Sequence, residues 1–198
     1  MLEITYNFNS MRIIGGSAKR RSLKSPSASL GVRPILGRIK KSLFDILRLR
    51  LENAEFLDLY AGSGAVGVEA LSRGAASVTF VDMNPGCLSI IRQNLSKLQL
   101  FERARVVKAD ATKQLAHLGG PFDLIFMGPP YHDQKWNALH LTGPTLDAIA
   151  RAHILKPGGW VIGQHHAKEV PVQDPRWNMV RQENYGDSRL SFFEYVGF

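Results

Sequence analysis

The residues best suited to bind a small ligand lie in a glycine-rich segment, residues 58–67, with the sequence DLYAGSGAVG. The segment stands between an apolar run and a stretch with helical periodicity, and its glycines let the backbone approach a ligand closely. The spacing Gly62-x-Gly64-x-x-Gly67 also satisfies the dinucleotide fingerprint, so it does not separate NAD from S-adenosylmethionine. Asp58 favours S-adenosylmethionine, because an acid attracts its cationic methionine end and would repel a pyrophosphate. A plain glycine turn is the alternative.

Two further acids follow the next two predicted strands. Asp82 ends the second strand, 18 residues after Gly64, about where an acid hydrogen-bonds a ribose diol, although it could instead cap the turn that follows. Asp110 follows the third strand and could reach an adenine amine or cap a helix that begins near Thr112. The residues expected to bind the cofactor are Asp58, Tyr60, Ala61, Gly62, Ser63, Gly64, Asp82, Met83, Asp110 and Ala111.

A second candidate site is the sequence Gly128-Pro129-Pro130-Tyr131, directly after the apolar run 124–127. Two prolines fix the backbone and remove N–H donors, which leaves carbonyl oxygens facing the site beside an aromatic ring. Such a turn can hold a planar base, accept hydrogen bonds from its exocyclic amine and leave the nitrogen lone pair available for methyl transfer. These four residues are the expected catalytic group. A purely structural turn is the alternative.

The positive charge of the chain is concentrated in its first quarter. Residues 1–50 contain 11 Lys and Arg against two acids, a net charge of +9, whereas residues 51–198 have a net charge of −1. A basic segment attracts polyphosphates and releases their condensed counterions, so a nucleic acid is the expected partner. A solvated charged face and an Arg- and Ser-rich transit peptide are the alternatives.

The elements that must position these residues follow from hydrophobic periodicity. Residues 11–33 predict a hairpin or extended arm with a loop near 26–31, and a helix begins at Pro34 with apolar residues at three- and four-residue spacing through Leu47. Alternating strands and helices then predict a parallel, doubly wound α/β sheet with an antiparallel edge. The strands are expected near residues 56–60, 77–82, 105–108, 122–127, 160–163, 177–184 and 190–196, and the helices near 67–73, 86–98, 112–118 and 145–154.

Other features narrow the class of protein. The single cysteine, Cys87, cannot form an internal disulfide and is expected to be a small core residue in a reducing, cytoplasmic protein. Neither a signal-peptide core nor an apolar run of membrane-spanning length is present in the sequence. His132 and the pair His165-His166 lack a third ligand at recognisable spacing, so we expect no metal. The three tryptophans could stack a base, but core or edge packing is their ordinary role.

Taken together, these residues resemble class I S-adenosylmethionine-dependent methyltransferases. The closer resemblance is to the bacterial 16S ribosomal RNA guanine-N2 methyltransferases of RsmD type. It rests on MRIIGG at residues 11–16, Arg33-Pro34 with Arg38, LFDIL at 43–47, residues 58–74, Asn94, residues 122–131 and Gly186-Asp187. The glycine loop is class-level evidence, whereas the opening RIIGG at residues 12–16, combined with Arg33-Pro34 and the Pro-Pro-Tyr turn, is far more specific.

The resemblance implies a Rossmann-like fold with a seven-stranded sheet, S-adenosylmethionine as cofactor and transfer of one methyl group to a guanine 2-amino group. It also implies an RNA-contacting extension at residues 1–33, followed by a methyltransferase domain at 34–198. The partner would be ribosomal RNA or a small-subunit particle, with no membrane, and the protein is expected to be a monomer. The residues expected to contact RNA are Arg12, Lys19, Arg20, Arg21, Arg33 and Arg38.

The sequence departs from the family pattern most clearly at Gly128, where amino-methyltransferases of this kind carry Asp or Asn. Because a side-chain acceptor for the amine is missing, we expect turnover to be reduced. Gly37 and Gln164 each replace a frequent acid, without deciding the function. The competing hypotheses are an RNA-binding paralogue with weakened catalysis, an amino-methyltransferase acting on DNA and, with the least support, an NAD-dependent oxidoreductase.

Overall fold

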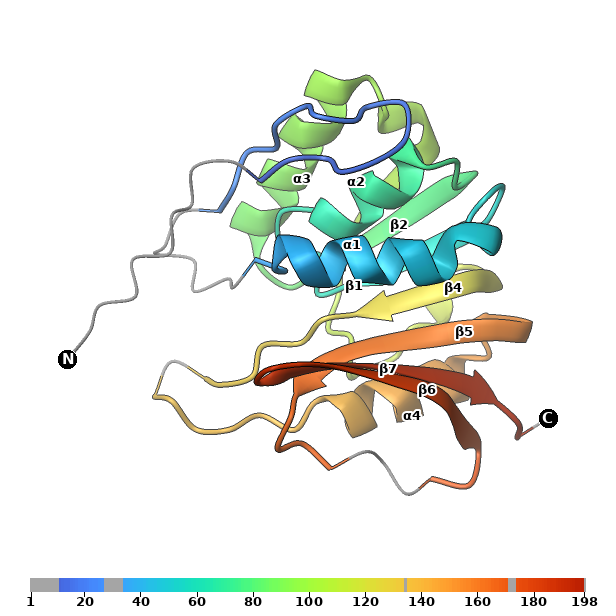
Figure 1. The fold of residues 1–198 in the computed structure, drawn as a ribbon. Helices are drawn as coiled ribbons and strands as arrows, with labels where there is room; N and C mark the ends of the chain where they lie inside the picture. The colour runs from blue at the N-terminus through green and yellow to red at the C-terminus, as the bar shows by residue number, and fades with distance from the viewer. Residues whose placement is uncertain (1–10, 27–33, 134, 171–173, 198) are drawn as a thin grey trace.

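In the computed structural model, residues 11–26, 34–133, 135–170 and 174–197 are described. They form one seven-stranded sheet with the strand order β3-β2-β1-β4-β5-β7-β6, shown in Figure 1. The strands are β1 (Glu55–Leu59), β2 (Ser77–Asp82), β3 (Ala104–Lys108), β4 (Phe122–Met127), β5 (Leu155–His166), β6 (Trp177–Tyr185) and β7 (Ser188–Tyr195). The α-helices are α1 (Gly37–Ile46), α2 (Ala65–Ser72), α3 (Pro85–Leu98) and α4 (Thr142–Ala152).

The predicted fold class is confirmed. The strands β1 to β5 pair in parallel, whereas β7 pairs antiparallel with both β5 and β6 and so forms the antiparallel edge with β6. Two short strands in the middle of the sheet, β1 and β4, are buried almost along their whole length, as expected where helices cover both faces. Among the described helices, none combines the length and the apolar character that a membrane crossing requires.

Two expected helices differ from the structure. The helix predicted near 112–118 is wrong: the chain forms only a short 3-10 turn at Ala116–Leu118, because the left-handed Gly119 and Gly120 and then Pro121 follow at once. The first helix was expected to begin at Pro34 but begins at Gly37, after Leu36 in an extended conformation. Cys87 is buried in α3, as predicted.

The expected N-terminal hairpin is confirmed for residues 11–26, while the loop near 26–31 lies mostly outside the described residues. Arg12 and Ser22 form an antiparallel bridge, and the backbone N–H of Ile13 donates to the carbonyl of Arg21 at 3.0 Å. The hairpin is drawn in blue across α2 and α3 in Figure 1. Its apolar residues Ile13, Ala18 and Leu23 are buried in the same core as α1, α2 and α3. The expected division between an extension and a domain at residue 33 therefore separates segments that share one core.

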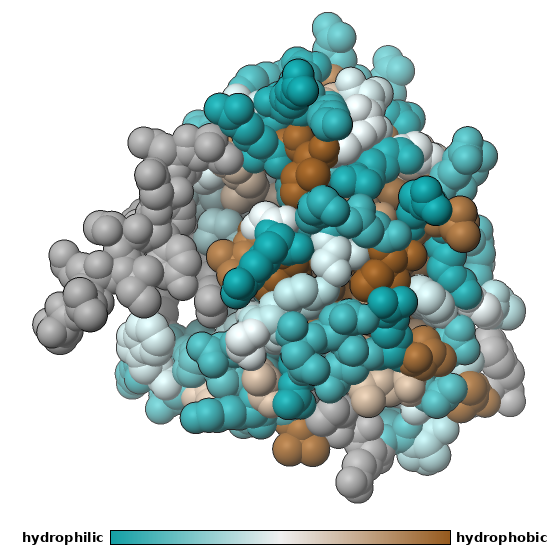
Figure 2. Space-filling view, viewed as in Figure 1, coloured by the Kyte–Doolittle hydropathy of each residue, from teal (hydrophilic) through white to brown (hydrophobic). Residues whose placement is uncertain are grey.

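The two faces of the sheet support two separate apolar clusters. Helices α1, α2 and α3 and the hairpin pack on one face, whereas α4 and the turn at Ala116–Leu118 pack on the other. The face that carries α1 is largely hydrophilic outside, with scattered apolar patches (Figure 2). The C-terminal ends of the parallel strands lie at one edge, where a fold of this kind places its ligands. The loop after β4 and the turn between β6 and β7 project from this edge, at the left of Figure 1.

Gly67 sets how closely α2 approaches β2, which gives a first prediction. A Cβ at this position would lie 2.3 Å from Cε1 of Phe80 and 2.8 Å from Cγ1 of Val78, both on β2. Gly67→Ala should therefore force α2 away from the sheet and lower the free energy of unfolding by about 1 to 3 kcal/mol, the usual cost of overpacking. Urea unfolding of the purified variant measures this loss.

Gly37→Ala is the matched control, because a Cβ at the start of α1 meets nothing within 4 Å. Alanine in a helix is favoured over glycine by up to about 1 kcal/mol, so this variant should be as stable as the natural protein or slightly more so. Equal stability of the two variants would contradict the close packing of α2 on β2.

Candidate functional site

Two carboxylates accept hydrogen bonds from the backbone of the glycine-rich segment after β1. Oδ2 of Asp58 accepts a hydrogen bond from the backbone N–H of Gly67, and Oδ2 of Asp82 accepts one from the backbone N–H of Gly62, each at 2.8 Å. Tyr60, Gly62 and Gly64 all have a positive φ, of 59°, 57° and 78°. Three of five consecutive residues thus have a left-handed backbone conformation, so the loop turns tightly at the end of β1.

Asp58 lies beneath the loop, with only 1% of its surface exposed. Burial raises the pKa of its carboxyl to about 7, although the hydrogen bond from Gly67 works in the opposite direction. In this position Asp58 ties the first turn of α2 to the end of β1. Its expected direct contact with the methionine end of a cofactor stays a prediction.

Asp82 and Met83 lie at the end of β2, beside the loop. The second oxygen of Asp82, Oδ1, accepts from the backbone N–H of Asn84 at 2.8 Å, so the carboxylate both caps the following turn and fixes Gly62. Asp82 is half-buried, and the Met83 side chain beside it is 59% exposed. A half-exposed carboxylate next to an exposed apolar side chain can accept from a diol and cover one face of an aromatic ring.

Three other residues predicted to bind the cofactor make contacts within the protein. Tyr60 points towards α4, where its hydroxyl pairs with Oγ1 of Thr145 at 2.7 Å, and burial raises its pKa to about 12. Oδ1 of Asp110 accepts from both the backbone and the hydroxyl of Thr112, which lowers its pKa. Asp110 therefore caps a turn, whereas the helix near Thr112 that it was expected to cap does not form. The Ala111 side chain is buried in the core.

The N-terminal hairpin contacts the glycine loop directly. Asn94 on α3 donates from Nδ2 to the carbonyl of Ser63 at 3.0 Å and to the carbonyl of Lys24 at 3.1 Å, and its Oδ1 accepts from the backbone N–H of Lys24 at 2.8 Å. On the other side, the hydroxyl of Ser63 lies 3.2 Å from the sulfur of Met11. One amide side chain thus links the hairpin, α3 and the loop.

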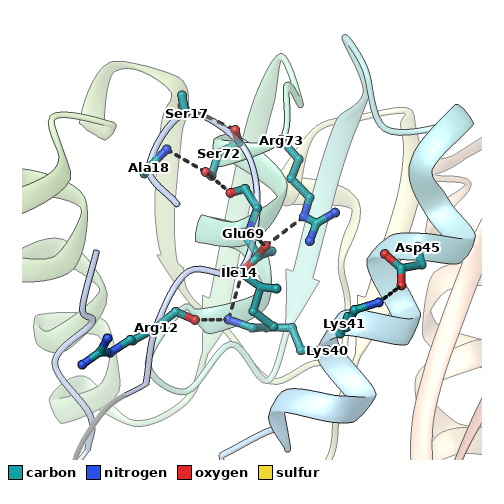
Figure 3. A network of polar contacts seen from close by, with 11 residues as sticks. Arg12, Ile14, Ser17, Ala18, Lys40, Lys41, Asp45, Glu69, Ser72 and Arg73 are labelled. Carbon is teal, nitrogen blue, oxygen red and sulfur yellow. Dashed lines mark hydrogen bonds and ion pairs between the residues drawn. The ribbon is translucent and has the colours of Figure 1, made fainter. Parts of the chain in front are cut away.

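A second link between the hairpin and the body is the buried carboxylate of Glu69 on α2 (Figure 3). Its two oxygens accept from the backbone N–H groups of Ile14, at 2.8 Å, and Gly15, at 2.7 Å. Nε of Arg73 lies at 2.8 Å and Nζ of Lys40 at 3.1 Å. Lys40 also donates to the carbonyl of Arg12 at 2.9 Å, and burial lowers its pKa. The sequence analysis did not identify Glu69 as a link between the hairpin and α2. One feature of the sequence does point to it: Glu69 is the only acid in a helix of apolar and small residues.

Ser72 and the glycine pair of the hairpin complete this contact. The hydroxyl of Ser72 donates to the carbonyl of Gly15 at 2.6 Å and accepts from the backbone N–H of Ala18 at 3.0 Å. At Gly16, with φ 75°, a Cβ would lie 1.7 Å from the carbonyl oxygen of Ser72. The turn at Gly15-Gly16 therefore packs directly against the end of α2. A residue larger than glycine at position 16 would prevent this contact.

The described residues predicted to contact RNA are exposed. Arg12, Lys19 and Arg20 lie on the hairpin, and Figure 3 shows the Arg12 guanidinium pointing away from Glu69. Arg21 is also exposed, but its Nη2 donates to the carbonyl of Lys97 at 2.6 Å. Arg38 is exposed on α1, and its Nη2 would lie 4.0 Å from a Cβ at Gly186 in the β6–β7 turn. Arg33 lies outside the described residues.

The turn Gly128-Pro129-Pro130-Tyr131 follows β4 at the same edge of the sheet as the glycine loop. The backbone N–H of Gly128 points to the carbonyl of Leu59, at 3.4 Å, so the turn adjoins the start of the loop. Gly128 does not adopt a left-handed conformation, and a Cβ there would lie 3.2 Å from Cε1 of Phe126. A side chain at this position therefore needs only a small movement of the Phe126 ring.

The Tyr131 hydroxyl is hydrogen-bonded to side chains of two strands, β7 and β5. The sequence did not predict these two contacts. Its hydroxyl donates to Oγ of Ser188 on β7 at 3.1 Å and accepts from Nε2 of Gln164 on β5 at 3.2 Å. Its ring makes an edge contact with His166, with centroids 5.6 Å apart. Within the described residues, no three His, Cys, Asp or Glu side chains are grouped closely enough to hold a metal ion.

Known proteins are similar in sequence to this chain over nearly its whole length. The sequence model of the family described as "Conserved hypothetical protein 95" matches residues 11–194. The "Ribosomal RNA small subunit methyltransferase D" of Escherichia coli K12 is 40% identical over 191 residues, which cover 93% of this chain and 89% of that protein.

Solved structures are similar to this chain over nearly the same length. The structure of YhhF from Escherichia coli, described there as a methyltransferase candidate, is 28% identical and superposes with a TM-score of 0.78, covering 93% of this chain and 97% of that one. A hypothetical protein from a Thermus species is 31% identical with a TM-score of 0.75, covering 92% of this chain and 98% of its own.

The buried Asp58 generates a prediction about pH. Because its pKa of about 7 in the folded protein exceeds the ordinary value of 3.8, the folded state binds its proton more tightly than the unfolded state does. The contribution of this group to stability is therefore largest below pH 4 and is lost as the pH rises towards 7. Asp58→Asn, which keeps an acceptor for Gly67, should become more stable relative to the natural protein across this interval, by about 2 to 4 kcal/mol.

Urea unfolding of both proteins between pH 4 and pH 8 measures this difference. Asp45→Asn is the control, since Lys41 lowers the pKa of the exposed Asp45 carboxyl, so that its contribution to stability should change little between pH 4 and pH 8. A difference between Asp58→Asn and the natural protein that does not change with pH would show that Asp58 ionises normally in the fold.

Proposed function

Because the chain belongs to the family described as "Conserved hypothetical protein 95", whose relatives include ribosomal RNA small subunit methyltransferases, we propose that it transfers a methyl group from S-adenosylmethionine to small-subunit ribosomal RNA. The acceptor is the 2-amino group of a guanine in 16S ribosomal RNA. The protein acts in the cytoplasm as a monomer.

The observation that carries this proposal is the meeting of two motifs at one edge of the sheet. The glycine loop follows β1 and the Gly-Pro-Pro-Tyr turn follows β4, and these two strands are neighbours. The contact between Gly128 and Leu59 brings the two motifs within a few ångströms of each other. A cofactor on the loop and a base on the turn would therefore lie side by side, as direct group transfer requires.

The residues at the ends of β1 and β2 fit S-adenosylmethionine. The glycine loop has only small side chains where the methionine end is expected, although residues 61–64 are buried, and the half-buried Asp82 can accept from ribose hydroxyls. The exposed Met83 side chain can cover an adenine face. When bound, this cofactor supplies a methyl group activated by a positively charged sulfur.

The chain's own residues act on the acceptor base. The Tyr131 ring, fixed through its hydroxyl by Ser188 and Gln164, holds the base by stacking. The carbonyl oxygens of Gly128 and Pro129 accept hydrogen bonds from the amine protons. As the amine nitrogen bonds to the methyl carbon, the bond from that carbon to the cofactor's sulfur would break and leave a neutral thioether. The nitrogen gains positive charge until it releases one proton to solvent, so these acceptors stabilise the transition state more than the ground state. Asp133 is poorly suited to help, because its own loop occupies both of its carboxylate oxygens.

RNA affinity comes from the hairpin and α1. Arg12, Lys19 and Arg20 present three cations on one side of the glycine loop, and Arg38 presents another near the β6–β7 turn. A polyphosphate chain can contact both groups while one base reaches the turn after β4.

The test is an assay with labelled S-adenosylmethionine and small-subunit particles that lack the modification. The proposal requires label in N2-methylguanine of 16S ribosomal RNA, identified by mass analysis of the nucleosides. Label in DNA adenine or cytosine from a parallel incubation would assign the site to DNA. Cofactor binding without label in either nucleic acid would leave an RNA-binding protein without turnover.

Gly128 generates a prediction about rate. The relatives give no support to a reduced turnover, and a substitution measures how much a side-chain acceptor adds to the rate. Gly128→Asn adds an acceptor without entering the left-handed region, and we expect kcat to rise by on the order of 10² with little change in cofactor affinity.

Gly128→Ala is the matched control, because it adds the same Cβ next to Phe126 without an acceptor. Single-turnover rates on the same particles should be unchanged or lower for this variant. If the glycine form already reacts as fast as Gly128→Asn, the carbonyl oxygens of Gly128 and Pro129 are sufficient acceptors.

The hairpin generates a prediction about RNA binding. Replacing Arg12, Lys19 and Arg20 by Gln should weaken binding to ribosomal RNA and reduce the slope of log K against log salt by roughly 2, about 0.7 for each lost phosphate contact. Filter binding at several salt concentrations measures the slope, and calorimetry measures the affinity for S-adenosylmethionine, which should not change.

The control replaces three cations elsewhere by Gln: Arg151 on α4, Lys156 on β5 and Arg181 on β6. The net charge is then the same, but the slope should stay close to that of the natural protein. An equal loss in both variants would show that only total charge matters. Loss of cofactor affinity in the hairpin variant would place the hairpin inside the cofactor site.

A further inference from the structure

A chain of four aromatic rings leads outward from the Gly-Pro-Pro-Tyr turn. The ring of Tyr131 contacts His166 at 5.6 Å between centroids, His166 contacts His132 at 6.1 Å, and His132 contacts Trp136 at 5.4 Å. Tyr131 is half-buried at the inner end, and Trp136 is 81% exposed at the outer end. The ordinary role of core or edge packing, expected for the tryptophans, is therefore wrong for Trp136. Trp177, by contrast, is only 7% exposed.

Trp136 is held in this exposed position by its own loop. Its φ of 62° lies in the left-handed region, which a bulky side chain rarely adopts and which costs free energy. The backbone around it is fixed by Asp133, whose Oδ1 accepts from the N–H groups of Lys135 and Asn137 and whose Oδ2 accepts from Nδ2 of Asn137, each at 2.8 Å. The carbonyl of Asp133 also accepts from the N–H of Trp136 at 3.1 Å.

The base of the loop is closed as well. The N–H of Leu139 donates to the carbonyl of Tyr131 at 2.8 Å, and His132 bridges to Ala138. The aromatic rings are thus presented by a hydrogen-bonded hairpin loop that starts at the catalytic turn itself. An exposed indole on a strained and well-bonded backbone is a costly arrangement for the free protein, and covering the ring would recover apolar surface.

The charge around the rings favours an anionic partner. Lys135 and Lys168 are exposed on the same loop or beside His166, and the one acid of the loop, Asp133, has its oxygens engaged by the loop's own N–H groups. Exposed aromatic rings interleaved with cations are typical of surfaces that bind single-stranded nucleic acid, since every base offers a π face.

We propose that Trp136 and His132 form a stacking platform for a second, unpaired base of the RNA substrate, next to the base held by Tyr131. The proposal rests on the proposed function for the identity of the substrate, but the platform itself is defined by ring geometry and exposure. It assigns to Trp136 and His132 the task of holding the strand beside the target nucleotide, so that the target base is presented to the turn in an unstacked state.

The test uses the full chain and its variants Trp136→Ala and Trp136→Phe, titrated with a mixed-sequence single-stranded oligoribonucleotide. Indole fluorescence should be quenched on binding by the natural protein, and Trp136→Ala should bind roughly 5- to 100-fold more weakly, the range for loss of one stacked base. Trp136→Phe keeps a π face and should retain most of the affinity. An abasic strand of the same length should bind the natural protein and Trp136→Ala equally.

Leu49→Ala is the matched control, because Leu49 is 88% exposed in the turn that follows α1 and should not affect RNA binding. In the particle assay, Trp136→Ala should raise KM for the particle and leave kcat within about twofold, since the platform does not touch the reacting atoms. Equal oligoribonucleotide affinity of the natural protein and Trp136→Ala would overturn the platform. So would loss of a dimer in Trp136→Ala, seen by light scattering, with RNA binding unchanged.

The two proposals fail separately. If the natural protein methylates no RNA, the proposed function fails, but quenching by the oligoribonucleotide and its loss in Trp136→Ala still decide whether the platform exists. If methylation proceeds and Trp136→Ala matches the natural protein in both affinity and KM, the platform alone is excluded.

Discussion

Glu69 lies fully buried in α2, and an ionised carboxylate in that position is stable only if donors reach both of its oxygens. The donors come from three separate parts of the chain: the hairpin backbone at Ile14 and Gly15, Lys40 of α1 and Arg73 at the end of α2 itself. The bonds that stabilise the Glu69 carboxylate therefore hold the hairpin and α1 against α2, the helix that follows the glycine loop. The N-terminal quarter carries most of the net positive charge, so the orientation of the proposed RNA-binding surface depends on this contact.

The position of the glycine loop also depends on the hairpin, because Asn94 is hydrogen-bonded both to Lys24 of the hairpin and to the carbonyl of Ser63 in the loop. On the far side of the site, Tyr131 depends on Ser188 and Gln164. The cofactor half and the base half of the site are therefore supported by different partners: the hairpin and α3 for one, the antiparallel edge for the other. The contact of Gly128 with Leu59 is where the halves meet.

The sequence predicts the sheet well because its central strands are short apolar runs with sharp ends, so β2 and β4 match the expectation to the residue. It predicts the helix near 112–118 wrongly, because Leu115 and Leu118 have helical spacing although the glycines that follow end the turn. The positions of the glycine loop and of the Pro-Pro turn follow from topology. The roles of Glu69 and Ser188 do not, since the hairpin partners of Glu69 and the Tyr131 partner of Ser188 lie more than 50 residues away in the sequence. No local pattern distinguishes an exposed Trp136 from a buried Trp177.

The place of β7 in the sheet has a consequence for the order in which the site can form during synthesis. β7 follows every other described strand in the chain, yet it lies between β5 and β6, and it carries the Ser188 that accepts from Tyr131. The glycine loop, β1 and β2 leave the ribosome more than 100 residues earlier. A nascent chain can therefore complete its cofactor half long before its base half, and the aromatic ring of the turn gains its support only when the sheet has closed around β7.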